Sequence, residues 1–166
     1  MEKFQSARKE ALTKIRAADH MLTQTYNSLK DTRILVSVLT NLWEGAENTM
    51  EAILFYDRAF KKIPPFHDNF SSKLNLFKNT SADIHNLGSF VPFLNQINDI
   101  FEGHRNSPVE FSRQDSFVIC DDSYRMKVVT TKDLKRLIDE AKRFYEEAAK
   151  ITSVDEQIFS MREENA

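Results

Sequence analysis

The sequence predicts an all-α fold, namely an antiparallel four-helix bundle with a β-hairpin insert before the last long helix. Two observations predict it. Long segments repeat apolar residues every three or four positions, as one buried face of an α-helix requires. Residues 107–130 instead contain short β-type runs bounded by turn-forming residues. A chain of 166 residues buries enough surface for one core, so we expect a single domain over residues 1–166.

The first two expected helices cover about residues 2–29 and 32–63. The first has one apolar stripe, which begins at Phe4 and ends at Leu29. The second has a wider stripe, which indicates contact with two neighbours and predicts that this helix is central. We expect Pro64–Pro65 to end it, because neither ring can donate the backbone hydrogen bond that a continuing helix needs.

The third expected helix begins near Asp68–Asn69, where either side chain is a good N-cap. Pro92 lies within its apolar pattern and lacks a backbone N–H, so we expect the helix to be kinked or broken near this residue. Gly103 fits the left-handed position that commonly closes a helix.

The insert that follows is expected to be a β-hairpin. Ser107–Pro108 begins an extended segment in which Val109–Phe111 alternates. Phe117–Cys120 and Arg125–Val129 are typical of strands, and Asp121–Tyr124 between them has the composition of a turn. An isolated two-stranded hairpin is marginally stable in water, so it should pack on the bundle or pair with another strand.

The last expected helix starts at Thr130 or Thr131, each a suitable cap, and its apolar stripe extends to Ile158. The first three helices are joined by short connections. An antiparallel arrangement is therefore the simplest way to bury all four stripes.

The overall charge limits the classes of partner. The formal net charge is −2 with 29% charged residues, which argues against broad, unspecific nucleic-acid binding. Cys120 is the single cysteine and lies in an apolar run, which predicts a buried, unreactive thiol. The charged N-terminal segment does not resemble a signal peptide, and the longest apolar run, residues 34–43, is too short to span a bilayer. We therefore expect a cytoplasmic protein without a membrane segment.

No motif predicts a metal or a cofactor. None of the four histidines has a Glu three residues before it, so the paired ligands of a carboxylate-bridged metal bundle are missing. Asp83 with His85, and His67 with Asp68, remain isolated pairs. The glycine-rich phosphate loops and the Gly-x-Ser-x-Gly nucleophile motif are also absent.

The insert contains the candidate contact residues. Its mixture of basic, acidic and aromatic side chains indicates contact with a partner protein or with nucleic acid, against the alternative of a solvated face of mixed charge. The candidates are His104, Arg105, Glu110, Arg113, Tyr124, Arg125 and Lys127. Further basic residues near chain turns are Lys61, Lys62, Lys132, Lys135 and Arg136.

An enzymatic alternative uses acid–base groups of the insert. Its candidate residues are Glu110, Arg113, Asp115, Asp121 and Asp122. Adjacent carboxylates such as Asp121 and Asp122 raise one another's pKa only if they are brought close in a shielded site. At a hairpin tip we expect them to be exposed turn formers instead.

Three segments of the chain resemble the HEPN superfamily of small helical bundles. They are Ile100–Arg105, Ser107–Phe111 and Phe117–Ile119. Active members of that superfamily are metal-independent ribonucleases with an Arg followed shortly by a His near the last helix. No His follows His104 here, so that motif cannot be assigned. The resemblance implies a non-catalytic, dimeric bundle linked to nucleotide or RNA biology.

Two functions therefore lead. The first is a non-enzymatic helical interaction module that self-associates as a dimer, because four amphipathic helices and a hairpin offer an excess of apolar surface. Its alternative is that one monomer buries every stripe. The second is RNA or nucleotide binding through basic and aromatic residues of 104–130, which would weaken steeply with added salt.

Overall fold

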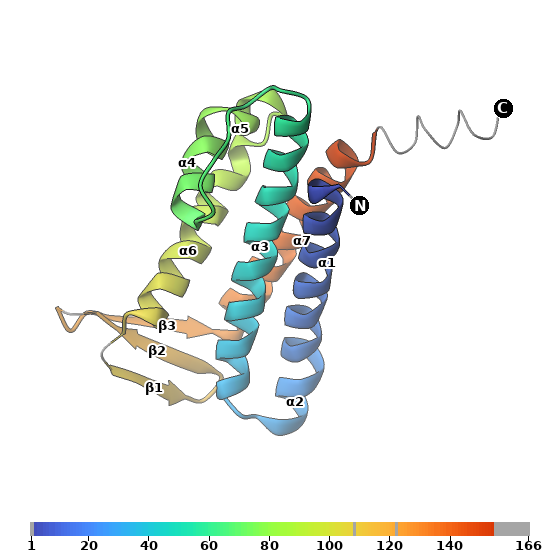
Figure 1. The fold of residues 1–166 in the computed structure, drawn as a ribbon. Coiled ribbons are helices and arrows are strands. Elements are labelled where there is room, and N and C mark those ends of the chain that lie inside the picture. The colour runs from blue at the N-terminus through green and yellow to red at the C-terminus, as the bar shows by residue number, and fades with distance from the viewer. Residues whose placement is uncertain (1, 108, 122, 155–166) are drawn as a thin grey trace.

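The computed structural model describes residues 2–107, 109–121 and 123–154. It is mostly helical, and a small antiparallel sheet, which follows α6 (Val91–Arg105) and precedes α7 (Thr131–Thr152) in the chain, lies at one end of the helices (Figure 1). A helical protein with a β insert in this position is therefore confirmed. Among the described residues, every helix is too short or too polar to cross a membrane.

The first expected helix is present and includes a π-helical segment. Helix α1 (Lys3–His20) continues through a π-helix (Met21–Thr25) into α2 (Tyr26–Leu29), and Lys30 ends it in the left-handed conformation at φ 53°. The wider π turn is energetically less favourable than an α turn and is often retained at functional sites.

Helix α3 (Arg33–Ala59) ends earlier than predicted. Lys61 takes the left-handed conformation at φ 57°, and the Lys62 N–H donates to the Asp57 carbonyl, which closes the helix before Pro64–Pro65 is reached. Helix α3 contacts α1, α6 and α7 as well as α4 (Phe70–Asn79), so the prediction of a central helix is confirmed.

The third expected helix is divided into α4, α5 (Ser81–Ile84) and α6 (Val91–Arg105), with a 3-10 turn at Gly88–Phe90. The Asn69 side chain caps α4 by accepting from the Ser72 N–H at 2.8 Å. The break precedes Pro92, which lies in the first turn of α6, where a missing N–H costs little.

The prediction for Gly103 was wrong. This residue lies inside α6 rather than at its end, and no described glycine has a positive φ. A Cβ on Gly103 would meet Ile119 at 3.5 Å, an ordinary van der Waals distance, so neither the backbone conformation nor the packing requires a glycine here.

The insert forms three strands. They are β1 (Val109–Arg113), β2 (Ser116–Cys120) and β3 (Met126–Thr130), paired antiparallel in the order β1-β2-β3. The predicted hairpin corresponds to β2 and β3, and β1 supplies the additional pairing strand on the other side of β2. Pro108 and Asp122 lie outside the described residues.

Helix α7 (Thr131–Thr152) begins with a capping box. The Thr130 hydroxyl accepts from the Asp133 N–H at 3.1 Å, and the Asp133 carboxylate accepts from the Thr130 N–H at 3.0 Å. The predicted start at Thr130 or Thr131 is confirmed. The expected continuation to Ile158 lies outside the described residues.

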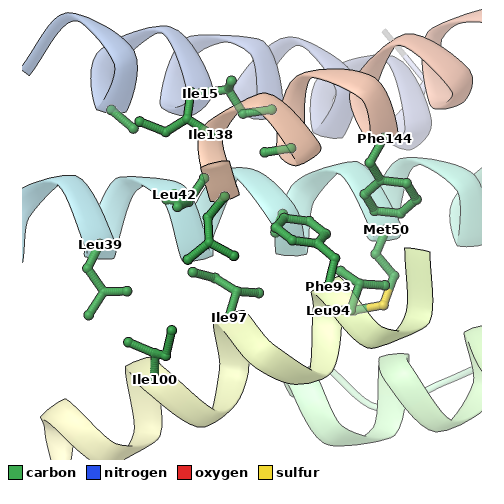
Figure 2. Close-up of a cluster of buried hydrophobic side chains, with 14 of the residues drawn as sticks. Ile15, Leu39, Leu42, Met50, Phe93, Leu94, Ile97, Ile100, Ile138 and Phe144 are labelled. Carbon is green, nitrogen blue, oxygen red and sulfur yellow. The ribbon is translucent and has the colours of Figure 1, made fainter. Parts of the chain in front are cut away.

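One core joins the long helices and the sheet. Figure 2 shows Ile15 of α1, Leu42 of α3, Ile97 of α6 and Phe144 of α7 in a single cluster. Phe117 of β2 belongs to the same core, so the insert is an integral part of the fold.

A buried lysine attaches α4 to α3. The Lys73 side chain is 2% exposed, and its ammonium group lies 3.1 Å from the Glu47 and Glu51 carboxylates and 2.8 Å from that of Asp68. Burial alone would lower the pKa of Lys73, but its hydrogen bonds to Asp68 and Glu47 hold that pKa above the ordinary value. Burial raises the pKa of Glu47 despite the neighbouring ammonium.

We predict that Lys73→Met destabilises the protein by about 2–4 kcal/mol, because it leaves partly buried carboxylates without a counter-charge. Urea unfolding measures the change. Lys78→Met is the matched control, since Lys78 lies on the same helix and forms no ion pair among the described residues. Equal losses in the two variants would contradict an ionic role for Lys73.

Candidate interaction surface and polar clusters

The two faces of the sheet differ in what they contact. Successive side chains of a strand point to opposite faces. Phe117 and Ile119 of β2, together with Val129 of β3, belong to the helical core. Their strand neighbours therefore form the opposite face, where Val118 pairs with Val128 and Cys120 pairs with Met126.

This opposite face is apolar and partly open to solvent. Val118 and Cys120 on the central strand are buried, which confirms the predicted burial of the thiol. On β3 next to them, Met126 is 60% exposed and Val128 is 44% exposed. We call these four residues the outer sheet face. Tyr124, at 81% exposure, lies two residues before Met126 in the adjoining turn.

The predicted contact residues at the end of α6 already have partners within the chain. The His104 ring lies 6.4 Å from the Phe117 ring in an edge-to-face arrangement. The Arg105 guanidinium is exposed and 3.7 Å from the Glu102 carboxylate. The contact with Phe117 places His104 against the helix-facing side of the sheet, whereas the ion pair of Arg105 stays within α6.

The turn between β2 and β3 is organised by Asp121. Its carboxylate accepts from the Arg125 backbone N–H at 2.8 Å, from the Ser123 N–H at 2.9 Å and from Arg125 Nε at 3.0 Å. The backbone N–H of Arg125 contributes most to holding the pKa of Asp121 below its usual value. Asp121 is therefore a turn former, as predicted.

The remaining predicted residues do not gather into one surface. Lys127 pairs with Ile119 in the sheet register and so belongs to the face opposite Met126. Glu110 pairs with Ile119 from the other side, and its side chain lies outside what the structure describes. Arg113, the last residue of β1, is exposed and pairs with Ser116, so it lies on the same side of the sheet as Val118 and Cys120. Of the seven candidates, Tyr124 and Arg113 are the two next to the outer sheet face, Tyr124 in the turn before Met126 and Arg113 in the register opposite Ser116.

A buried polar cluster was missed by the sequence analysis. The Asp57 carboxylate of α3 is fully buried, accepts from the Ser81 hydroxyl at 2.6 Å and lies 2.7 Å from Nε2 of His85. The sequence paired His85 with Asp83, whereas Asp57 is its partner in the fold. The sequence did not predict this contact because Asp57 and His85 are 28 residues apart and lie on either side of the break between α3 and α4.

The arrangement of this cluster does not activate a nucleophile. Ser81 and His85 both bond to Asp57, so the carboxylate lies between them and the imidazole is not the acceptor of the serine proton. Ser81 is also fully buried. The described residues contain no group of three or more side chains suited to hold a metal ion. The cluster therefore attaches α5 to α3.

A second missed contact joins the first helix to the insert. The Tyr26 hydroxyl donates to the Asp115 carboxylate at 2.5 Å. Burial, followed by this hydrogen bond, raises the pKa of Tyr26 to about 12. Asp115 lies in the two-residue turn between β1 and β2 with φ 55°, so a strained turn is held against α2.

No protein-family model, curated protein or solved structure matches this chain. The resemblance to the HEPN superfamily therefore stays a prediction.

We predict that Asp57→Asn lowers the free energy of unfolding by about 1–3 kcal/mol, because the substitution weakens two buried hydrogen bonds to a charged acceptor. Thermal or urea unfolding measures the change. Asp83→Asn alters an exposed carboxylate two residues from His85 and should stay within about 0.5 kcal/mol of wild type. A larger loss in Asp83→Asn would show that Asp83 is the partner that matters.

Proposed function

We propose that this protein is a non-enzymatic interaction module built on an antiparallel four-helix bundle, and that two copies associate through the outer sheet face. The observation that carries the proposal is the exposure of Met126 and Val128 on one face of β3, with the exposed Tyr124 two residues before Met126 in the sequence. Exposed neighbouring apolar side chains on a small protein commonly mark a surface for protein contact.

The chemistry of this face favours a second copy of the chain as its occupant. The β2–β3 residue pairs on this face are Val118–Val128, Cys120–Met126 and Ser116–Thr130, and none of these side chains carries a charge. At the adjoining turn, Arg125 is paired with Asp121. Arg113 of β1 pairs with Ser116 and lies at the edge of this side of the sheet. A two-fold axis through the β2–β3 pairs would therefore place uncharged side chains together and leave Arg113 at the rim of an isologous interface.

The acid–base residues considered for an enzyme give less support to catalysis. Asp115 precedes β2 and Asp121 follows it, so these two carboxylates lie at opposite ends of one strand. Each also has a partner, Tyr26 for Asp115 and Arg125 for Asp121. Catalysis by a pair of carboxylates needs them to converge. The non-enzymatic proposal agrees better with this separation.

RNA or nucleotide binding through residues 104–130 stays a prediction. Two of its cations, Arg105 and Arg125, lie beside the carboxylates of Glu102 and Asp121. A nucleic-acid strand would have to compete with these ion pairs. The apolar outer sheet face is consequently the stronger basis for a function.

We predict that wild-type protein sediments as a dimer at micromolar concentration and that Val128→Lys weakens this dimer by about tenfold or more, because the interface would have to bury an ammonium group. Ile84→Lys is the matched control, since Ile84 of α5 is 45% exposed and lies away from the sheet. Circular dichroism checks that each variant is folded.

Two outcomes would contradict the proposal. One is a wild-type protein that remains monomeric over the whole concentration range. The other is a dimer that Val128→Lys and Ile84→Lys affect equally. A wild-type monomer that captures a different protein through Val128 would replace self-association with a heterologous partner.

A further inference from the structure

A pocket of 340 Å³ lies on a surface of the protein other than the outer sheet face. Three parts of the chain that are distant in sequence form it. These are the segment from Leu22 to Lys30, the β1–β2 turn at Asp115, and the first residues of α7 from Thr131 to Lys135. Its volume is in the range of small-molecule sites.

Three lysines line this pocket, namely Lys30, Lys132 and Lys135. None of the three forms an ion pair with a carboxylate within the part of the chain that the structure describes. The Lys30 ammonium lies 5.2 Å from the centre of the Tyr26 ring, a cation–π contact that holds it beside the pocket. The pocket therefore gathers three ammonium groups that form no ion pair with a carboxylate among the described residues.

The carboxylates nearest in sequence to these lysines are bound elsewhere. Asp31, next to Lys30, is held by the Arg33 guanidinium at 2.6 Å. Asp133, between the two lysines of α7, accepts from the Thr130 N–H in the capping box. Asp115 is the one acidic lining residue, and the Tyr26 hydroxyl donates to it. An anion entering the pocket would meet three ammonium groups and one hydrogen-bonded carboxylate.

The backbone around the pocket is shaped by two unusual local conformations. The π-helix Met21–Thr25 supplies Leu22 and Thr23 to the lining, and the chain then continues into Tyr26. The strained turn at Asp115 accepts the Thr131 N–H on its backbone carbonyl at 3.1 Å. Strained backbone and π turns are commonly retained where they form a functional site. The contacts of Asp115 with Tyr26 and Thr131 hold the three parts of the pocket together without a ligand.

We infer that this pocket binds the phosphate group of a small-molecule ligand through the ammonium groups of Lys30, Lys132 and Lys135. Lysine is a common phosphate ligand because its compact charge can approach an oxyanion from several directions. A phosphate carries more negative charge than a single carboxylate and so suits three cations better. The site adds a ligand-binding activity to the proposed self-association and uses different residues.

Isothermal titration calorimetry with inorganic pyrophosphate at low salt tests the inference. We expect Lys132→Gln/Lys135→Gln to weaken binding by about tenfold or more, because it removes two charged donors. The charge-matched control is Lys61→Gln/Lys62→Gln, which removes two exposed lysines that do not line the pocket. Binding should survive in this control. An equal loss in both double variants would overturn the site, since it would show that total charge alone governs the affinity.

Asp115→Asn provides a test that does not depend on losing function. Asn keeps an oxygen acceptor for the Tyr26 hydroxyl and tolerates a positive φ, so the turn should fold as before. Removal of the one negative charge in the lining should tighten pyrophosphate binding by about fivefold. Unchanged or weaker binding in a folded Asp115→Asn protein would overturn the inference.

Two further titrations identify the source of the phosphate. Citrate, an anion without phosphate, should bind much more weakly than pyrophosphate, and equal binding would overturn the assignment to phosphate. A single-stranded oligouridine should bind the lysines of α7 no more tightly than pyrophosphate does. If the oligouridine bound through Lys132 and Lys135 while pyrophosphate did not, the site would belong to an RNA strand, and the small-molecule assignment would be wrong.

Discussion

The burial of Phe117 and Ile119 in the helical core is the constraint on which the two candidate surfaces depend. Because strand side chains alternate, these two residues fix which face of the sheet meets the helices and which face is turned away. Val118 and Cys120 are thereby placed on the outer sheet face. The same placement brings the β1–β2 turn to the first helix, where Asp115 meets Tyr26.

Polar contacts attach α4 and α5 to α3. Lys73 joins α4 to the carboxylates of α3, and Asp57 of α3 receives Ser81 and His85 from the α5 region. Among the described residues, no buried side-chain nitrogen or oxygen lacks a hydrogen-bond partner. Removing one partner of such a buried pair would leave the other charge uncompensated, which is strongly destabilising. These contacts make α3 the element to which the divided third helix is attached.

The sequence predicted those parts of the fold that depend on interactions between residues close in the chain. Amphipathic stripes located the long helices, and the start of α7 was predicted at Thr130 or Thr131 because a helix cap depends on residues close in sequence. The turn organised by Asp121 was predicted for the same reason. The end of α3 was predicted too late. The left-handed conformation of Lys61 ends the helix before Pro64, and a lysine in this conformation has no distinctive sequence signal. The prediction for Gly103 failed because this glycine continues α6 with a negative φ and does not adopt the left-handed conformation that would end the helix.

The candidate sites depended on contacts that a single sequence does not reveal. Asp57 and His85, or Tyr26 and Asp115, are joined by folding across separate elements. Lys132 and Lys135 were recognised as basic, but their pocket requires Lys30 from the far end of the first helical segment. Met126 and Val128 were assigned to a strand, yet their exposure could be known only after the sheet had been placed on the helices.

A dilution series observed by methyl NMR tests self-association through the outer sheet face most directly. The proposal predicts that the Met126 and Val128 methyl resonances shift or broaden together as the concentration rises, while those of the similarly exposed Ile84 do not change. Resonances of Met126 and Val128 that stay constant from the lowest to the highest concentration would contradict it.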